Sequence, residues 1–137
     1  MYKYFIKKVL HMVKGDMIEC LVDLGFGIYH RVVVKLAGFN ALEPIKNYRA
    51  RKQAQQLGLD LDTVVSIGRN IKDILSETIG SAGDGKLILE SKHVDDKHTC
   101  YGIVRLSESS TLNEYLRETQ ERLIHVALLR RDQKKTG

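Results

Sequence analysis

The chain has 137 residues, 43% of them hydrophobic, which suits one domain spanning residues 1–137 and leaves little room for two. Lysine and arginine number 22 against 17 aspartate and glutamate residues, and the net charge of +5 favours polyanionic partners. No run approaches the roughly 18 uncharged apolar residues of a membrane span, and residues 1–16 lack the apolar stretch of a secretion signal. We therefore expect a cytoplasmic protein without a membrane partner, in which Cys20 and Cys100 are reduced thiols.

Three strands are predicted at the start of the chain, because tyrosine, phenylalanine and β-branched residues dominate there. In the second of them Ile18, Cys20 and Val22 alternate with other residues and share one face. Glycine-containing turns separate the three segments and would connect them as a meander. The predicted strands are residues 2–13, 17–24 and 29–37.

Helices and a hairpin are predicted after Pro44. The segment NYRARKQAQQL suits a helix with few apolar residues, and a buried helix is expected over 63–79 behind an Asp62 cap. Residues 86–94 and 100–106 read as a hairpin, and a last helix begins near Thr111 and ends in a basic polar tail at about 130–137. The pattern predicts an α+β protein whose five strands and two or three helices suit an OB-type β-barrel, among several options.

Four short segments narrow these options. They are KGDMIECLVD at 14–23, KLAGFNALE at 35–43, DDKHTCYGIVRL at 95–106 and LNEYL at 112–116. Together and in this order they resemble motifs of the staphylococcal nuclease family, over about residues 4–126. The resemblance implies a staphylococcal nuclease-like barrel.

The resemblance also implies a set of site residues. The family cleaves phosphodiesters with calcium, which two aspartates and a backbone carbonyl hold, while a glutamate lies near the attacking water. Matched by position, Asp16, Asn40 and Ala41 stand at the metal ligands and Glu43 at the catalytic glutamate. An amide at Asn40 brings no negative charge, so we expect weakened calcium affinity.

The two phosphate-binding arginines of that family are replaced. Lys35 stands at the first and keeps the charge without the bidentate fork, and Ile103 stands at the second and keeps neither. Arg105 shares a strand face with Ile103, and Arg31 shares one with Lys35, so both arginines are candidates to contact phosphate. With Glu43, Lys35 and Arg105 as catalytic candidates and Arg31, Lys35 and Arg105 as substrate-binding candidates, we expect little ordinary nuclease activity.

Simpler interpretations exist for four of these residues. Asp16 also suits a turn after Gly15, Glu43 suits an exposed loop, and Arg31 and Lys35 suit a half-exposed strand face.

Three functions follow from these interpretations. The first is a protein that binds single-stranded DNA or RNA and carries a degenerate phosphodiesterase site. The second is an active calcium-dependent nuclease with altered ligands. The third is a protein-interaction module or inhibitor that uses residues 44–80 as its surface. The oligomeric state stays open.

Overall fold

Five strands close into a mixed barrel in this protein, whose computed structural model describes residues 2–94 and 99–136. The strands follow the order β1-β2-β3-β5-β4 around the barrel, with β3 and β5 parallel and the other neighbours antiparallel. The strands are β1 (Tyr2–Lys14), β2 (Met17–Asp23), β3 (Tyr29–Leu36), β4 (Ile88–Val94) and β5 (Thr99–Arg105).

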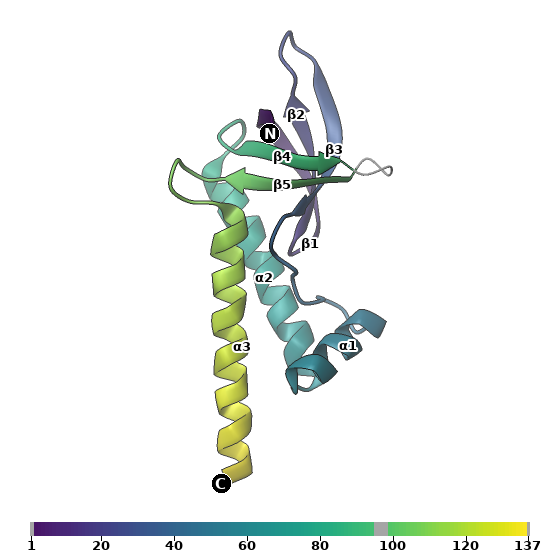
Figure 1. Ribbon diagram of the computed structural model, residues 1–137, viewed down its shortest axis with the longest axis vertical. Coiled ribbons are helices and arrows are strands. Elements are labelled where there is room, and N and C mark those ends of the chain that lie inside the picture. The colour runs from purple at the N-terminus through teal and green to yellow at the C-terminus, as the bar shows by residue number, and fades with distance from the viewer. Residues whose placement is uncertain (1, 95–98, 137) are drawn as a thin grey trace.

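Three helices complete the fold. α1 (Tyr48–Leu57) and α2 (Leu61–Ala82) lie between β3 and β4, and α3 (Leu112–Thr136) follows β5. Figure 1 shows α2 and α3 running side by side below the barrel, with α1 at the far end of α2. The architecture is α+β and consistent with an OB-type barrel, as predicted, and the described ranges contain three helices, within the predicted two or three. None of the helices in the described ranges is both long and apolar enough to cross a bilayer.

The strand predictions hold because alternation places one face of each strand in the core. Ile18, Cys20 and Val22 on β2 are all buried, and Val34 and Leu36 continue the same inner face on β3. They join a single cluster of buried side chains that also includes α2 and the start of α3. The turn expected between β4 and β5 falls partly on residues outside the described ranges.

Helix α2 begins two residues earlier than predicted. Asp60, not Asp62, is the cap: its carboxylate accepts a hydrogen bond of 2.8 Å from the backbone N–H of Thr63. Hydrogen bonding to Thr63 lowers the pKa of Asp60. Asp62 lies in the first turn instead, where it pairs with Lys46 at 2.7 Å. Both positions suit an acidic residue because the N-terminal end of a helix attracts negative charge.

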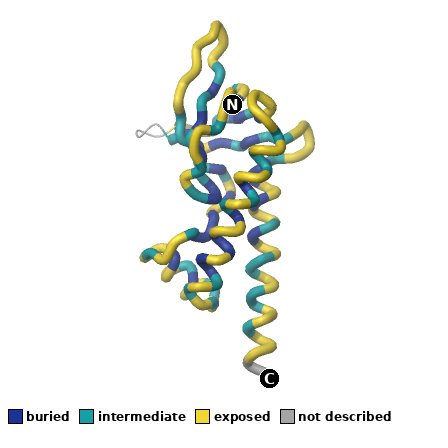
Figure 2. The backbone as a smooth tube through the Cα atoms, turned by 180° about the vertical axis from the view of Figure 1, so that it is seen from behind, coloured by how far each residue is buried: buried dark blue, intermediate teal, exposed yellow. Residues whose placement is uncertain are grey.

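Helix α3 includes most of the basic polar tail predicted at about 130–137, because it continues to Thr136. Nothing between Leu112 and Thr136 is glycine or proline, and long polar side chains such as lysine, arginine and glutamine favour helix. Figure 2 shows this end of α3 reaching past the rest of the molecule with mostly exposed residues. Arg131 ties it to the body, since its guanidinium donates to the carbonyl of Gly58 at 2.8 Å.

One glycine brings helix α2 against the candidate site. A Cβ atom on Gly68 would lie 2.3 Å from the carbonyl oxygen of Glu43 and 2.6 Å from that of Leu42. These are backbone atoms, so a larger residue would push α2 away from the segment that carries Glu43. Gly68 therefore sets the distance between the helix and the site.

Candidate functional site

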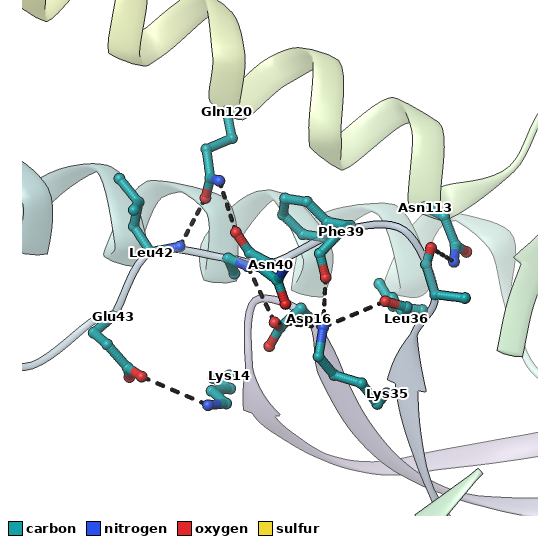
Figure 3. A network of polar contacts seen from close by, with 12 residues as sticks. Lys14, Asp16, Lys35, Leu36, Phe39, Asn40, Leu42, Glu43, Asn113 and Gln120 are labelled. Atoms are coloured by element: carbon teal, nitrogen blue, oxygen red, sulfur yellow. Dashed lines mark hydrogen bonds and ion pairs between the residues drawn. The ribbon is translucent and has the colours of Figure 1, made fainter. Parts of the chain in front are cut away.

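The candidate site forms where the β1–β2 turn meets the chain leaving β3. Asp16 lies in the turn, and its backbone carbonyl accepts a 2.8 Å hydrogen bond from the N–H of Leu36. This link places the end of β3, with Lys35, directly beside Asp16. The Nζ atom of Lys35 lies 2.8 Å from the Oδ2 atom of Asp16, and their side chains are only 16% and 5% exposed (Figure 3). Asp16, a predicted metal ligand, and Lys35, a predicted phosphate-binding residue, therefore form a nearly buried ion pair with each other.

The ammonium group of Lys35 is surrounded by oxygen atoms. Besides Asp16, it donates to the backbone carbonyl of Phe39 and, at 3.4 Å, to that of Leu36 (Figure 3). A carboxylate and backbone carbonyls are the ligands that a hard cation such as calcium takes. Lys35 thus supplies positive charge at the place where a metal ion was expected.

The carboxylate of Asp16 is further held by the chain that follows β3. Its Oδ2 atom accepts a hydrogen bond of 3.1 Å from the backbone N–H of Ala41. Its Oδ1 atom is buried and has no hydrogen-bond partner among the described residues. Asp16 is therefore more than a turn residue, since the turn alone would leave its side chain in solvent.

Glu43 is buried as well, which excludes the interpretation as an exposed loop acid. It is 6% exposed, and its Oε1 atom lies 3.6 Å from the Nζ atom of Lys14 (Figure 3). Its backbone N–H donates to the Oε1 atom of Gln53 on α1 at 3.0 Å. The two carboxylates of the site thus each have a lysine partner, Asp16 with Lys35 and Glu43 with Lys14. The charges of this group, which we call the lysine-carboxylate cluster, balance without an added ion.

Helix α3 fixes the segment between Phe39 and Glu43 through residues that the sequence analysis did not single out. The amide of Gln120 accepts from the N–H of Leu42 at 2.8 Å and donates to the carbonyl of Asn40 at 2.9 Å. About two turns earlier on α3, Asn113 donates to the carbonyl of Ala37 at 2.8 Å and accepts from the N–H of Val104 at 2.9 Å. Both residues are buried, and their spacing of seven places them on one face of α3. Two amide residues seven positions apart within an apolar helical stripe are the sequence signal that could have identified these contacts.

The two arginine candidates, Arg31 and Arg105, form ion pairs outside the lysine-carboxylate cluster. Arg31 pairs with Glu19 on the neighbouring strand at 3.4 Å, and its side chain is 69% exposed. Arg105 pairs with Glu90 across β4 and β5 and donates to the carbonyl of Glu108 at 3.2 Å. The hydrogen bond from Arg105 lowers the pKa of Glu90. Of the three predicted substrate-binding residues, only Lys35 lies in the lysine-carboxylate cluster.

Two of the oxygen atoms predicted to hold calcium, Oδ2 of Asp16 and the carbonyl of Ala41, already have partners within the chain, whereas Oδ1 of Asp16 has none among the described residues. The carbonyl of Ala41 accepts from the Nε2 atom of Gln53 at 3.5 Å, and Asp16 binds Lys35. Calcium takes 6 to 8 oxygen ligands in proteins. Asn40, the remaining predicted ligand, is exposed. No group of three or more His, Cys, Asp or Glu side chains in the described ranges is placed to hold a metal. The residues present do not fit calcium, and the binding of calcium by this chain stays an untested expectation.

Both cysteines are free and buried in the barrel, as expected for reduced thiols. Burial raises the pKa of Cys20 to about 12, with a further contribution from neighbouring Cys100. A thiol with this pKa stays protonated near neutral pH and is a poor nucleophile or metal ligand. We assign Cys20 to the core.

Comparisons with known proteins add no relative to this description. No protein-family model matches the chain, and neither the curated proteins nor the solved structures include a significant match. The resemblance to staphylococcal nuclease therefore rests on the four short motifs alone.

Proposed function

We propose that this chain binds single-stranded nucleic acid and does not cleave it. The observation that carries the proposal is the charge of the segment around α1. From Pro44 to Leu59 the chain contains four lysine or arginine residues and no acidic residue. Such a local excess of positive charge attracts phosphates.

The position of these side chains supports contact with a polyanion. Ala50 and Ala54 face the body of the protein, while Arg49, Arg51 and Lys52 are exposed. We call these three residues the α1 basic face. Figure 1 shows α1 at the edge of the molecule, where a strand of nucleic acid has access.

An exposed aromatic ring beside this face favours single strands over duplexes. Tyr48 is 71% exposed at the start of α1, and the Nζ atom of Lys52 lies 5.5 Å from the centre of its ring. Aromatic side chains stack on unpaired bases, whereas bases in a duplex are stacked on one another. Tyr48 is the residue of α1 that suits this role.

The lysine-carboxylate cluster supports the second part of the proposal, the absence of cleavage. A metal-dependent phosphodiesterase needs a cation that polarises the phosphoryl oxygen. Lys35 holds Asp16 and Lys14 lies beside Glu43, so two amino groups neutralise the carboxylates that would bind the ion and orient the water. We infer that the cluster stabilises the fold and takes no part in hydrolysis.

Fluorescence anisotropy with labelled 15-nucleotide DNA and RNA single strands tests the binding. We expect binding at about 50 mM salt that weakens steeply at about 200 mM. Replacing the three residues of the α1 basic face with glutamate is expected to lower affinity at least tenfold and to reduce the salt dependence by about 0.7 per lost contact. A variant with Arg117, Arg122 and Arg130 changed to glutamate carries the same charge change on α3 and is the matched control.

Three results would contradict the proposal. Equal loss of affinity in the α1 and α3 variants, or no binding at about 50 mM salt, would each exclude a specific role for α1. The third is cleavage of the labelled strand with calcium, magnesium or manganese that the Glu43→Gln variant abolishes. That result would restore the active nuclease with altered ligands.

A further inference from the structure

The tip of the β2–β3 hairpin presents a phenylalanine to solvent. The side chain of Phe26 is fully exposed, and Leu24 and Ile28 beside it are about half exposed. Figure 1 shows the hairpin reaching beyond the rest of the barrel, and Figure 2 shows its tip as exposed. Residues 24–29 contain no charged side chain. Large apolar side chains gathered in solvent in this way mark a surface that another molecule contacts.

The turn itself does not require a phenylalanine at this place. Phe26 has a φ angle of 55°, between Gly25 at 85° and Gly27 at 71°. Glycine and asparagine adopt this left-handed region readily, whereas bulky side chains rarely do. Residues held in such conformations concentrate at functional sites. Since asparagine or glycine would form the same turn with less strain, the side chain and not the turn accounts for phenylalanine at position 26.

Three hydrogen bonds hold the tip in one conformation. The backbone N–H of Leu24 donates to the carbonyl of Ile28, and the N–H of Ile28 donates to the carbonyl of Gly25, both at 2.9 Å. The N–H of Gly25 also donates to the Oδ1 atom of Asp23 at 2.8 Å. An ordered tip loses little conformational entropy when a ligand binds, which favours affinity.

Both faces of the Phe26 ring are accessible. Its neighbours Gly25 and Gly27 have no side chains, and beyond the adjacent residues no atom lies within 4 Å of a Cβ placed on either of them. A flat ring with two accessible faces suits insertion between two unpaired bases, because aromatic side chains stack on bases. Leucine and isoleucine are also side chains that nucleic-acid-binding proteins insert between base steps. The composition of the tip therefore fits bases.

Lysines behind the tip supply the positive charge that phosphates require. Residues 1–15 include four lysines and no acidic residue. Within the described ranges, Lys3 and Lys14 have acidic partners, whereas Lys7 and Lys8 have none. A register shift in the pairing of β1 with β2 falls at Lys7, and both of these lysines are exposed there.

These lysines lie within reach of a strand that engages the tip. The Nζ atom of Lys7 is 5.6 Å from the ring centre of Tyr29, which follows Phe26 by three residues. At about 3.3 Å per residue, Tyr29 lies about 10 Å behind the tip, a length that about three stacked nucleotides span. Arg31 is paired with Glu19, so Lys7 and its neighbour Lys8 are the cations available to phosphate near the tip.

We propose that the β2–β3 hairpin is a second contact for single-stranded nucleic acid, in which Phe26 stacks between two unpaired bases and Lys7 and Lys8 bind neighbouring phosphates. Figure 1 shows the hairpin at the top of the molecule and α1 near the bottom, so the two contacts are separate surfaces. The inference rests on the proposed function only for the class of ligand. The chain has room for two short strands at once.

Fluorine NMR on the whole chain tests the inference. Fluorophenylalanine labels the three phenylalanines of the sequence, of which Phe39 is buried and serves as an internal reference. The probe is a DNA single strand of about five nucleotides, added to the variant with glutamate on the α1 basic face, so that α1 does not bind it. We expect a saturable shift of the Phe26 signal at strand concentrations up to about 1 mM. An abasic strand of the same length, which has phosphates without bases, is expected to leave this signal unchanged.

Variants at the tip separate stacking from folding. Phe26→Asn suits the left-handed backbone, so we expect an equal or higher Tm together with an affinity for the strand at least tenfold lower, measured from the amide signals of the hairpin. Phe26→Trp is expected to bind as tightly as the unchanged chain. Tyr115→Ala removes an aromatic side chain of α3 that is 44% exposed, and this matched control is expected to bind normally.

Changing both lysines tests the phosphate contacts. Lys7→Gln combined with Lys8→Gln is expected to weaken binding and to reduce the salt dependence by about 0.7 per lost contact. Arg31→Gln is the control on the same hairpin and is expected to leave the salt dependence nearly unchanged, because Glu19 already pairs with Arg31.

The following results would overturn the proposal. An unchanged Phe26 signal at about 1 mM strand would exclude an affinity of use, and equal shifts with the abasic strand or with a blunt duplex would exclude stacking on unpaired bases. A shift that follows protein concentration, with a dimer in sedimentation, would assign the tip to a second copy. A shift with phosphatidylserine vesicles but not with the strand would assign it to a lipid surface.

The two nucleic-acid contacts fail independently in these experiments. A Phe26 shift without any effect of the α1 basic face on affinity would refute the proposed role of α1 and support the hairpin. Binding that depends on α1, with an unchanged Phe26 signal, would refute the hairpin alone.

Discussion

Among single residues, Lys35 is expected to contribute strongly to the free energy of unfolding, because it pairs with a carboxylate that is almost wholly buried. We expect Lys35→Met to lower the free energy of unfolding by about 3 kcal/mol, since it leaves the charge of Asp16 uncompensated. Urea unfolding measures the change. Asp16→Asn added to Lys35→Met is expected to recover part of the loss, because it removes the unpaired charge.

Lys46→Met is the matched control for this prediction. Lys46 and Asp62 are as close, at 2.7 Å, but their side chains are 59% and 81% exposed. Solvent screens such a pair, so we expect a change below about 0.5 kcal/mol. Equal losses in the two variants would show that Lys35 contributes nothing beyond a surface ion pair.

Gly68 allows a second prediction about a single residue. Gly68→Ala places a methyl group against the carbonyls of Leu42 and Glu43, so we expect a loss of several kcal/mol in the free energy of unfolding. Gly80→Ala lies in the same helix with no atom within 4 Å of the added Cβ. There we expect no loss, or a gain of up to about 1 kcal/mol from helix propensity. Thermal unfolding of both variants makes the comparison, and a mild effect at Gly68 would mean that α2 moves freely.

At the scale of the elements, the β4–β5 pair predicts how stability depends on pH. Arg105 lowers the pKa of Glu90 from its ordinary value of 4.5, so the folded protein binds fewer protons at this group than the unfolded chain. The stabilisation is present above pH 4.5 and is lost as pH falls through the lowered pKa of the folded state. We expect Glu90→Gln to have a flatter dependence of Tm on pH between about pH 2.5 and 5. Circular dichroism at a series of pH values tests this, and parallel curves for the two proteins would contradict it.

For the whole molecule, the internal balance of charge predicts indifference to calcium. Ligands that bind only the folded state raise its stability. The Nζ atom of Lys35 lies 2.8 Å from Oδ2 of Asp16, and its positive charge repels a cation at this carboxylate. We expect calcium at about 10 mM, or a chelator, to change Tm by less than about 1 °C. Magnesium is the control for the effect of ionic strength. A saturable rise of several degrees with calcium alone would show that the ion displaces Lys35.

The fold and the site were predictable to different extents. Alternation in β2 and the apolar stripe of α2 indicated the strands and the buried helix, because burial on one face leaves a periodic trace in sequence. The motif match singled out Asp16, Lys35 and Glu43, and the structure pairs Asp16 with Lys35 and Glu43 with Lys14. The cap of α2 was predicted at Asp62 instead of Asp60 because both residues suit a helix start.

The strands, the buried helix and the excess of positive charge are predictable from local sequence, because they depend on periodicity and composition. Which charges neutralise one another follows only from the fold. The ion-pair partners of Lys35, Arg31 and Arg105 depend on strand register and on which side chains are buried together. The spacing of residues along the chain predicts neither of these.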